Sequence, residues 1–124
     1  MFQWPVRVYY ANYLRFMERA RTEWMRALGF EQDRLIREEG IVFAVRSANV
    51  EFLRPARFND LLTVVTELQQ RGRASLTFTQ SISRQHEASQ PCCTGEVKVA
   101  CVNAETFRPQ PIPEILMKEI VNVD

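Results

Sequence analysis

Three cysteines and one histidine are the side chains of this sequence best suited to act as a nucleophile, a base or a metal ligand: Cys92, Cys93, Cys101 and His86. A nucleophilic thiol needs a base beside it, and the single histidine lies in a polar stretch. The odd number of cysteines, without a Cys-x-x-Cys pair, favours neither a disulfide framework nor a zinc site. We interpret the cysteines as small apolar residues in a reducing compartment, with a catalytic thiolate as the alternative. We predict no metal and no cofactor.

Glu18 and Arg21 are a second pair of residues with chemical potential. They are three positions apart, a spacing that allows an ion pair on a helix. On a helical wheel, Glu18 lies at the border of the apolar half and Arg21 projects into it. A buried guanidinium needs a partner, and by residue type Glu18 and Glu51 are the nearest candidates. We interpret Arg21 as structural.

The element that carries this pair is predicted from a helical period over residues 12–28. Asn12 is a suitable N-cap and Gly29 a suitable stop. The apolar residues cover one half of the helix, and we therefore predict that the helix is largely enclosed. They are Tyr13, Leu14, Phe16, Met17, Ala20, Trp24, Met25, Ala27 and Leu28.

Most of the remaining chain has the pattern of strands. The clearest period of two places Ala74, Leu76, Phe78 and Ile82 on one face of a strand. One enclosed helix and about five strands predict an α+β fold, with an antiparallel sheet curled around the helix and one domain over residues 1–124. Strands are expected at residues 4–10, 41–53, 61–69, 74–82 and 94–102, and short helices at residues 31–39 and 114–121.

Composition excludes several classes of function. The formal net charge is +1, which gives no broad basic surface for nucleic acid. No apolar run approaches the roughly 20 residues needed to span a bilayer. Residues 1–5 lack the charged-then-apolar layout of a secretory signal. We expect a cytoplasmic protein.

Four segments carry a resemblance to a known family. They are residues 2–10 (FQWPVRVYY), 12–23 (NYLRFMERARTE), 50–60 (VEFLRPARFND) and 75–80 (SLTFTQ). Together they resemble the hotdog-fold acyl-CoA thioesterases of the 4-hydroxybenzoyl-CoA thioesterase family, of the Tol-Pal-associated type. The resemblance implies hydrolysis of coenzyme A thioesters, with acyl carrier protein thioesters as an alternative substrate. It also implies a homodimer or homotetramer. A dehydratase on the same fold is disfavoured because the helix has no histidine.

The sequence departs from this family at one place. Relatives of this type carry a loop of the form Glu-Asp-Thr-Asp-x-x-Gly-x-Val-Tyr-His before the helix, whereas here Ala11 follows Tyr10 directly. The loop holds the catalytic aspartate of the family and its companion histidine. Either the protein has the loop and this sequence lacks it, which we favour, or the protein has lost it. In the second case we expect a non-catalytic module that binds acyl thioesters.

The resemblance also implies roles for residues that are present. The free N–H groups at a helix N-terminus would stabilise the thioester oxygen, here near Ala11, Asn12 and Tyr13. Tyr10 would act beside the aspartate and histidine of the loop, and Tyr13 would line the acyl pocket. In some hotdog enzymes a helix carboxylate is the base, which makes Glu18 a candidate. Basic side chains for the phosphates of coenzyme A would be Arg54, Arg57 and Arg73. Packing or solvated surface positions are the alternative interpretation for each.

Overall fold

The computed structural model describes residues 2–7, 13–56 and 60–121 of the chain. Its strands form one antiparallel five-stranded sheet in the order β1-β3-β4-β5-β2. β1 and β2 are therefore the edges of the sheet. The strands are β1 (Phe2–Arg7), β2 (Ile41–Phe52), β3 (Leu61–Arg71), β4 (Ser75–Arg84) and β5 (Pro91–Asn103).

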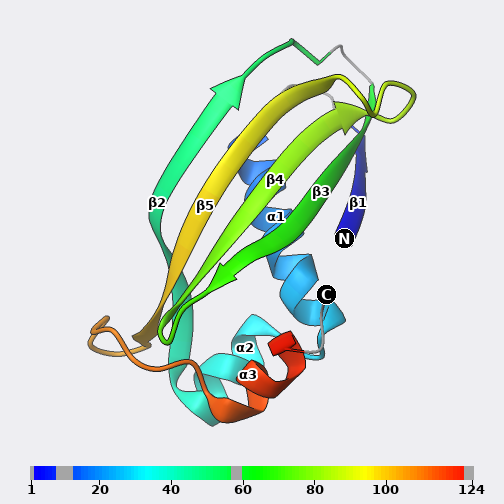
Figure 1. Ribbon diagram of the computed structural model, residues 1–124. Coiled ribbons are helices and arrows are strands. Elements are labelled where there is room, and N and C mark those ends of the chain that lie inside the picture. Colours follow the sequence, from blue (N-terminus) through cyan, green and yellow to red (C-terminus); the bar gives the residue numbers. More distant parts are fainter. Residues whose placement is uncertain (1, 8–12, 57–59, 122–124) are drawn as a thin grey trace.

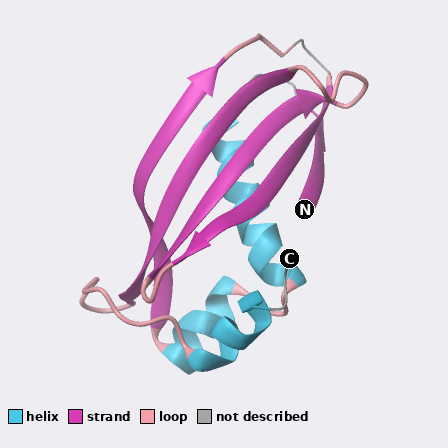
Figure 2. Ribbon diagram, in the orientation of Figure 1, coloured by secondary structure: helices cyan, strands magenta, loops and turns pink. Residues whose placement is uncertain are grey.

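One long helix, α1 (Tyr13–Ala27), lies along the inner face of this sheet (Figure 1). Shorter helices gather at one end of the sheet, as Figure 2 shows. They are α2 (Gln32–Arg34), which continues as a π-helical turn over Leu35–Glu39, and α3 (Glu114–Val121). Gly29 and Gly40 end helical segments with φ angles of +94° and +67°, values that glycine adopts without strain.

The core between α1 and the sheet has two clusters. One surrounds the C-terminal half of α1, where the rings of Trp24 and Phe78 meet edge to face with centroids 5.0 Å apart. It extends to the short helices, and Leu116 of α3 is fully buried there. The other lies at the N-terminal half of α1 and includes Tyr13 and Met17.

The predicted α+β fold is confirmed, and each predicted element is found within a few residues of its expected bounds. Residues 8–10 of the first predicted strand lie outside the described residues. The enclosure predicted for α1 is only partial: Tyr13, Met17, Ala20, Trp24 and Met25 are buried, whereas Leu14 is 55% exposed. The reason is geometric, since a single sheet covers one side of a helix and leaves the opposite side open.

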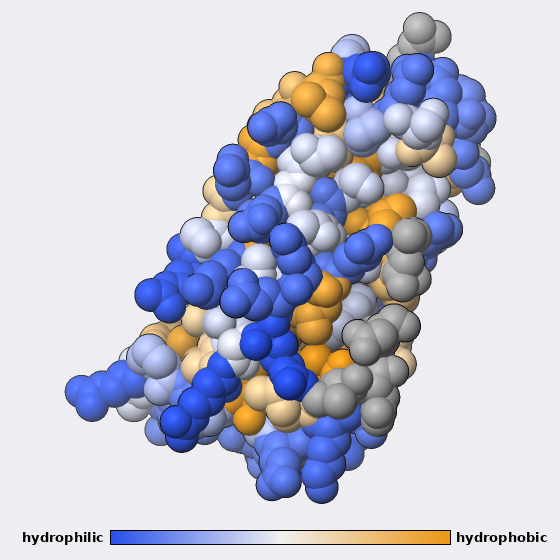
Figure 3. Space-filling model, in the orientation of Figure 1, coloured by the Kyte–Doolittle hydropathy of each residue, from blue (hydrophilic) through white to orange (hydrophobic). Residues whose placement is uncertain are grey.

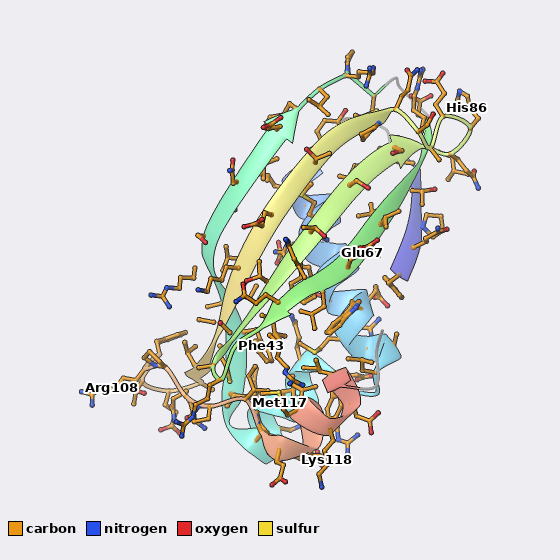
Figure 4. All side chains as sticks on the ribbon, viewed as in Figure 1. Phe43, Glu67, His86, Arg108, Met117 and Lys118 are labelled. Atoms are coloured by element: carbon orange, nitrogen blue, oxygen red, sulfur yellow. The ribbon has the colours of Figure 1, made fainter. Side chains whose placement is uncertain are left out.

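The outer face of the sheet is mostly polar (Figure 3). Glu67 of β3 projects from this face in Figure 4, and its side chain is exposed. Within the described residues, no helix has the length and apolar character needed to cross a membrane.

Candidate active site

Much of the predicted catalytic region precedes the described start of α1. Tyr10, Ala11, Asn12 and Arg57 lie outside the described residues. Tyr13 is the first residue of α1, and no acidic residue occupies the first turn of this helix. The positive end of the helix dipole is therefore not neutralised by a carboxylate of its own turn.

Tyr13 fastens the start of α1 to the turn after β2. Its hydroxyl donates to the carbonyl oxygen of Arg54 at 3.2 Å and accepts from the backbone N–H of Ala56 at 2.7 Å. The side chain is only 8% exposed, and its burial raises the pKa of the phenol. The ring lies 5.8 Å from that of Phe52. Tyr13 thus holds a turn in place, and it is not among the residues that line the cavity described below.

The structure separates the two predicted phosphate-binding arginines that it describes. Arg54 is exposed near the start of α1, and its Nη1 donates to the carbonyl oxygen of Pro91 at 3.2 Å. Arg73 lies in the hairpin between β3 and β4, at the other end of the sheet. The eleven residues of β3 separate the two ends by about 35 Å. Arg73 therefore does not join the other predicted site residues.

An ion-paired cluster that the sequence did not predict lies near the start of α1. Arg84 binds Asp60 at 3.0 Å and Glu87 at 3.5 Å, and the side chains of Arg84 and Asp60 are each about 15% exposed. His86, in the loop after β4 (Figure 4), is 3.5 Å from Glu87 and mostly exposed. Asp60 is the last residue of the PARFND segment that resembles the family. The sequence therefore drew attention to this segment but did not predict the ion pair of Asp60 with Arg84.

A cavity of about 540 Å³ lies between the open side of α1 and strand β2. Most of its wall is apolar, and its polar side chains come mainly from α1. Leu14 of the first turn and Met25 near the last turn both contribute, so the cavity runs along most of the helix. The lining residues from α1 are Leu14, Met17, Glu18, Arg21, Thr22 and Met25, and those from β2 are Ile41, Val42, Phe43, Val45 and Ala48.

A buried amide, Gln80 of β4, orients the cation in this cavity. Gln80 is 3% exposed and accepts a hydrogen bond from Nη1 of Arg21 at 2.9 Å. Its Nε2 donates to the backbone oxygen of Met17 and to Oγ1 of Thr66, each at 2.9 Å. The hydrogen-bond partner of Arg21 is therefore Gln80 and neither candidate glutamate: within residues 2–7, 13–56 and 60–121 it forms no ion pair with Glu18 or Glu51, although Glu18 is close enough to raise its pKa. Gln80 lies on the same face of β4 as Leu76, Phe78 and Ile82, and this spacing of two could have predicted a buried polar residue.

The cysteines are free and buried, as predicted. Burial raises the pKa of Cys93 and of Cys101 from 9.0 to about 11. At neutral pH these two are thiols rather than thiolates, which disfavours them as nucleophiles. Within the described part of the chain, no group of His, Cys, Asp and Glu side chains is suited to hold a metal ion.

A five-stranded antiparallel sheet wrapped around one long helix is the hotdog fold, and comparison with known proteins identifies the family. Residues 6–120 match the Thioesterase-like superfamily. The chain is 37% identical to the acyl-CoA thioester hydrolase YbgC of Escherichia coli O6:H1, over 96% of this chain and 95% of that protein. It is 36% identical to the acyl-CoA thioesterase YbgC of Haemophilus influenzae, over 91% and 89% respectively. The chain belongs to the thioesterase-like superfamily.

Solved structures agree with this assignment. A probable thioesterase from Bartonella henselae superposes with a TM-score of 0.82 at 30% identity, covering 90% of this chain and 98% of that one. The DHNA-CoA thioesterase of Staphylococcus aureus superposes with a TM-score of 0.85 at 20% identity, covering 98% and 89%, and this similarity concerns the fold alone. The predicted family, fold and reaction class, thioester hydrolysis, are confirmed.

Proposed function

We propose that this protein hydrolyses acyl-CoA thioesters to the free acid and coenzyme A, at the N-terminal end of α1. Hydrolysis requires stabilisation of the carbonyl oxygen as it gains negative charge. Tyr10, Ala11, Asn12 and Tyr13 would surround this oxygen, with backbone N–H groups of the helix start as donors. The proposal rests on one observation: the cavity reaches the N-terminal end of α1, because Leu14 of the first turn lines its wall.

Arg54 is the described cation best placed for the phosphates of coenzyme A. It is exposed beside the turn that Tyr13 holds, and its Nη1 contact with Pro91 leaves further N–H donors for a phosphate. Arg57, three residues further along the chain, would act with it. Arg73 is not part of this proposal because of its distance along β3.

The catalytic carboxylate would come from the loop that the related enzymes carry between the positions of Tyr10 and Ala11. The alignment with the Escherichia coli enzyme has 130 positions but covers 96% of the 124 residues, about 119, so about eleven positions of the relative face gaps. The alignment with the Haemophilus enzyme has 124 positions and covers 91%, about 113 residues, which again leaves about eleven. The loop has eleven positions, so gaps of this size agree with the Escherichia coli and Haemophilus enzymes carrying a loop that this sequence lacks. We propose that the protein carries it as well.

Intact mass spectrometry tests the loop. The 124 residues account for 14.5 kDa, so a loop of eleven residues adds roughly one kilodalton. Sequencing across the junction of Tyr10 and Ala11 gives its composition. A purified protein whose mass equals 14.5 kDa lacks the loop. The better interpretation of its function is then a non-catalytic module that binds acyl thioesters.

The activity itself is tested by the release of free thiol from a panel of acyl-CoA thioesters of different length, with the corresponding acyl carrier protein thioesters as a second arm. We expect saturable release from the coenzyme A series. Release from the carrier protein series alone would change the proposed substrate, and a folded protein that carries the loop but releases no thiol from either series would refute hydrolysis.

A second copy of this chain is the partner that the sheet edge favours. β2 pairs on one side with β5 and lies at the edge of the sheet over twelve residues. Long unpaired edges are templates for strand pairing. We propose a homodimer joined through β2, with a homotetramer as the larger assembly. Sedimentation equilibrium distinguishes the two, and a monomer at micromolar concentration would contradict both.

The three free, buried cysteines support a cytoplasmic location.

A further inference from the structure

Two opposite charges line a cavity that is otherwise mostly apolar. Glu18 and Arg21 both come from α1 and both contribute to its wall. Among residues 2–7, 13–56 and 60–121 they form no ion pair with each other. The single hydrogen bond that the structure gives the Arg21 side chain goes to the neutral amide of Gln80. Both charged groups therefore keep capacity to bind a ligand in the same cavity.

The donor side of this pair is held in a fixed position. Gln80 is anchored by its bonds to Met17 and Thr66, so the oxygen that it offers to Arg21 is fixed. A guanidinium has five N–H donors, and one is used here. The Arg21 side chain is partly buried, and this burial lowers the pKa of its guanidinium while the nearby Glu18 raises it. A ligand oxygen bound there interacts more strongly than it would in bulk water.

We propose that this part of the cavity binds a hydroxyl group on the acyl chain of the substrate. Arg21 donates a hydrogen bond to the hydroxyl oxygen, and the carboxylate of Glu18 accepts a hydrogen bond from the hydroxyl. The inference rests on the proposed function, because it names the class of acyl group that the same site prefers. A hydroxyl is both donor and acceptor. A carboxylate would satisfy Arg21 but be repelled by the exposed Glu18, and a methyl group would displace water from the partly buried Arg21 without offering it a hydrogen bond.

Helix geometry sets the distance of this hydroxyl from the thioester. The Gln80 amide joins Arg21 to the backbone of Met17, so the cation lies beside the segment from Met17 to Arg21. At about 1.5 Å per residue, this segment is roughly 6 to 12 Å from Tyr13. An extended chain of about six to eight carbons spans that distance, given bond lengths of about 1.5 Å. The proposed substrates are acyl-CoAs of medium length that carry a terminal hydroxyl.

The test is a binding measurement that does not depend on turnover. The probes are ketone analogues of acyl-CoA, in which a methylene group separates sulfur from the carbonyl so that they cannot be hydrolysed. Octanoyl, 8-hydroxyoctanoyl and 7-carboxyheptanoyl forms are compared by titration calorimetry, together with the six-carbon series. We expect the hydroxylated form of at least one series to bind about tenfold more tightly than its unsubstituted form, as charge-assisted hydrogen bonds would give. Equal affinities, or tightest binding of the carboxylated form, would overturn the proposal.

Two variants locate the effect. Arg21→Met and Glu18→Gln should each reduce the preference for hydroxyl to about threefold or less, and Glu18→Gln should also improve binding of the carboxylated analogue. Arg19→Met, an exposed change on the same helix, is the matched control and should keep the tenfold preference. Thermal unfolding establishes that each variant is folded, and Glu18→Gln carries the test if Arg21→Met does not fold. A preference that survives in folded Glu18→Gln would refute the assignment of its carboxylate.

Failure of this inference differs from failure of the proposed function. Thiol release without any preference for hydroxylated analogues removes the hydroxyl subsite and leaves the thioesterase in place. A hydroxyl preference in binding, without thiol release from any substrate, keeps the subsite and removes hydrolysis.

Discussion

The two halves of helix α1 have different surroundings. The C-terminal half packs Trp24 and Met25 against the apolar ring of Phe78 and the short helices. In the middle of the helix, the carbonyl oxygen of Met17 and the side chain of Arg21 meet the buried amide of Gln80. On its open side, Leu14 and Glu18 face a cavity. Met25 and Phe78 also line this cavity, so the halves differ in polarity and not in access to it. The C-terminal half is anchored by apolar and aromatic contacts, whereas the charged side chains that face the cavity, Glu18 and Arg21, come from the middle of the helix.

The strongest test of the apolar half is Phe78→Ala. Phe78 is 1% exposed and contacts Trp24, so truncation should lower the free energy of unfolding by about 3–5 kcal/mol. Urea denaturation measures the change. Ile115→Ala, at a position that is 53% exposed, is the control and should cost less than about 0.5 kcal/mol. A loss below about 1 kcal/mol for Phe78→Ala would show that this half of the helix does not anchor the fold.

The polar half is tested by Gln80→Leu. This change keeps side-chain volume but removes the hydrogen-bond partner of Arg21 and of Thr66, and it should cost about 2–3 kcal/mol. Gln70→Leu, on exposed β3 surface, is the matched control and should be nearly neutral. If Gln80→Leu were as stable as the parent protein by the same denaturation measurement, the buried network would not hold the helix to the sheet.

A smaller effect is expected at the start of α1. Tyr13→Phe removes the hydroxyl that bonds Arg54 and Ala56 while keeping the buried ring, and it should cost about 1–2 kcal/mol. The same change should raise the KM for acyl-CoA more than it lowers kcat, because the turn carries Arg54. Steady-state thiol release separates the two constants. An unchanged KM would mean that the turn does not help to bind coenzyme A.

The smallest expected effect is the contribution of one buried cysteine in the cluster at each half of α1 to the pH dependence of stability, which appears only above neutral pH. Cys101 lies in the apolar cluster and Cys93 in the cluster at the start of α1, and both have a pKa raised to about 11 by burial. Unfolded thiols ionise near 9, so between pH 9 and 11 the unfolded state binds fewer protons and stability falls as pH rises. Urea denaturation from pH 8 to 11 under reducing conditions should show this fall. A double variant, Cys93→Ala with Cys101→Ala, should show a shallower one, and an identical pH dependence would contradict the assignment.

The elements were predictable because local signals agree with the fold. The apolar period of α1, the stop at Gly29 and the alternation through Leu76 and Phe78 are local properties of the sequence, and they gave the helix and β4. The pairing of Arg21 with Gln80 was not predictable, because it joins residues 59 positions apart and depends on sheet register. For the same reason the sequence does not reveal that β3 places Arg73 at the opposite end of the sheet from Arg54.

In the proposed mechanism, the positive end of α1 polarises a bound thioester carbonyl. Infrared difference spectroscopy measures this directly on a carbonyl-labelled ketone analogue of octanoyl-CoA bound to the protein. We predict that the carbonyl stretch moves to a lower frequency than in water, because the N–H groups of the helix start withdraw electron density toward the oxygen. A bound analogue whose carbonyl frequency equals or exceeds that in water would contradict the account.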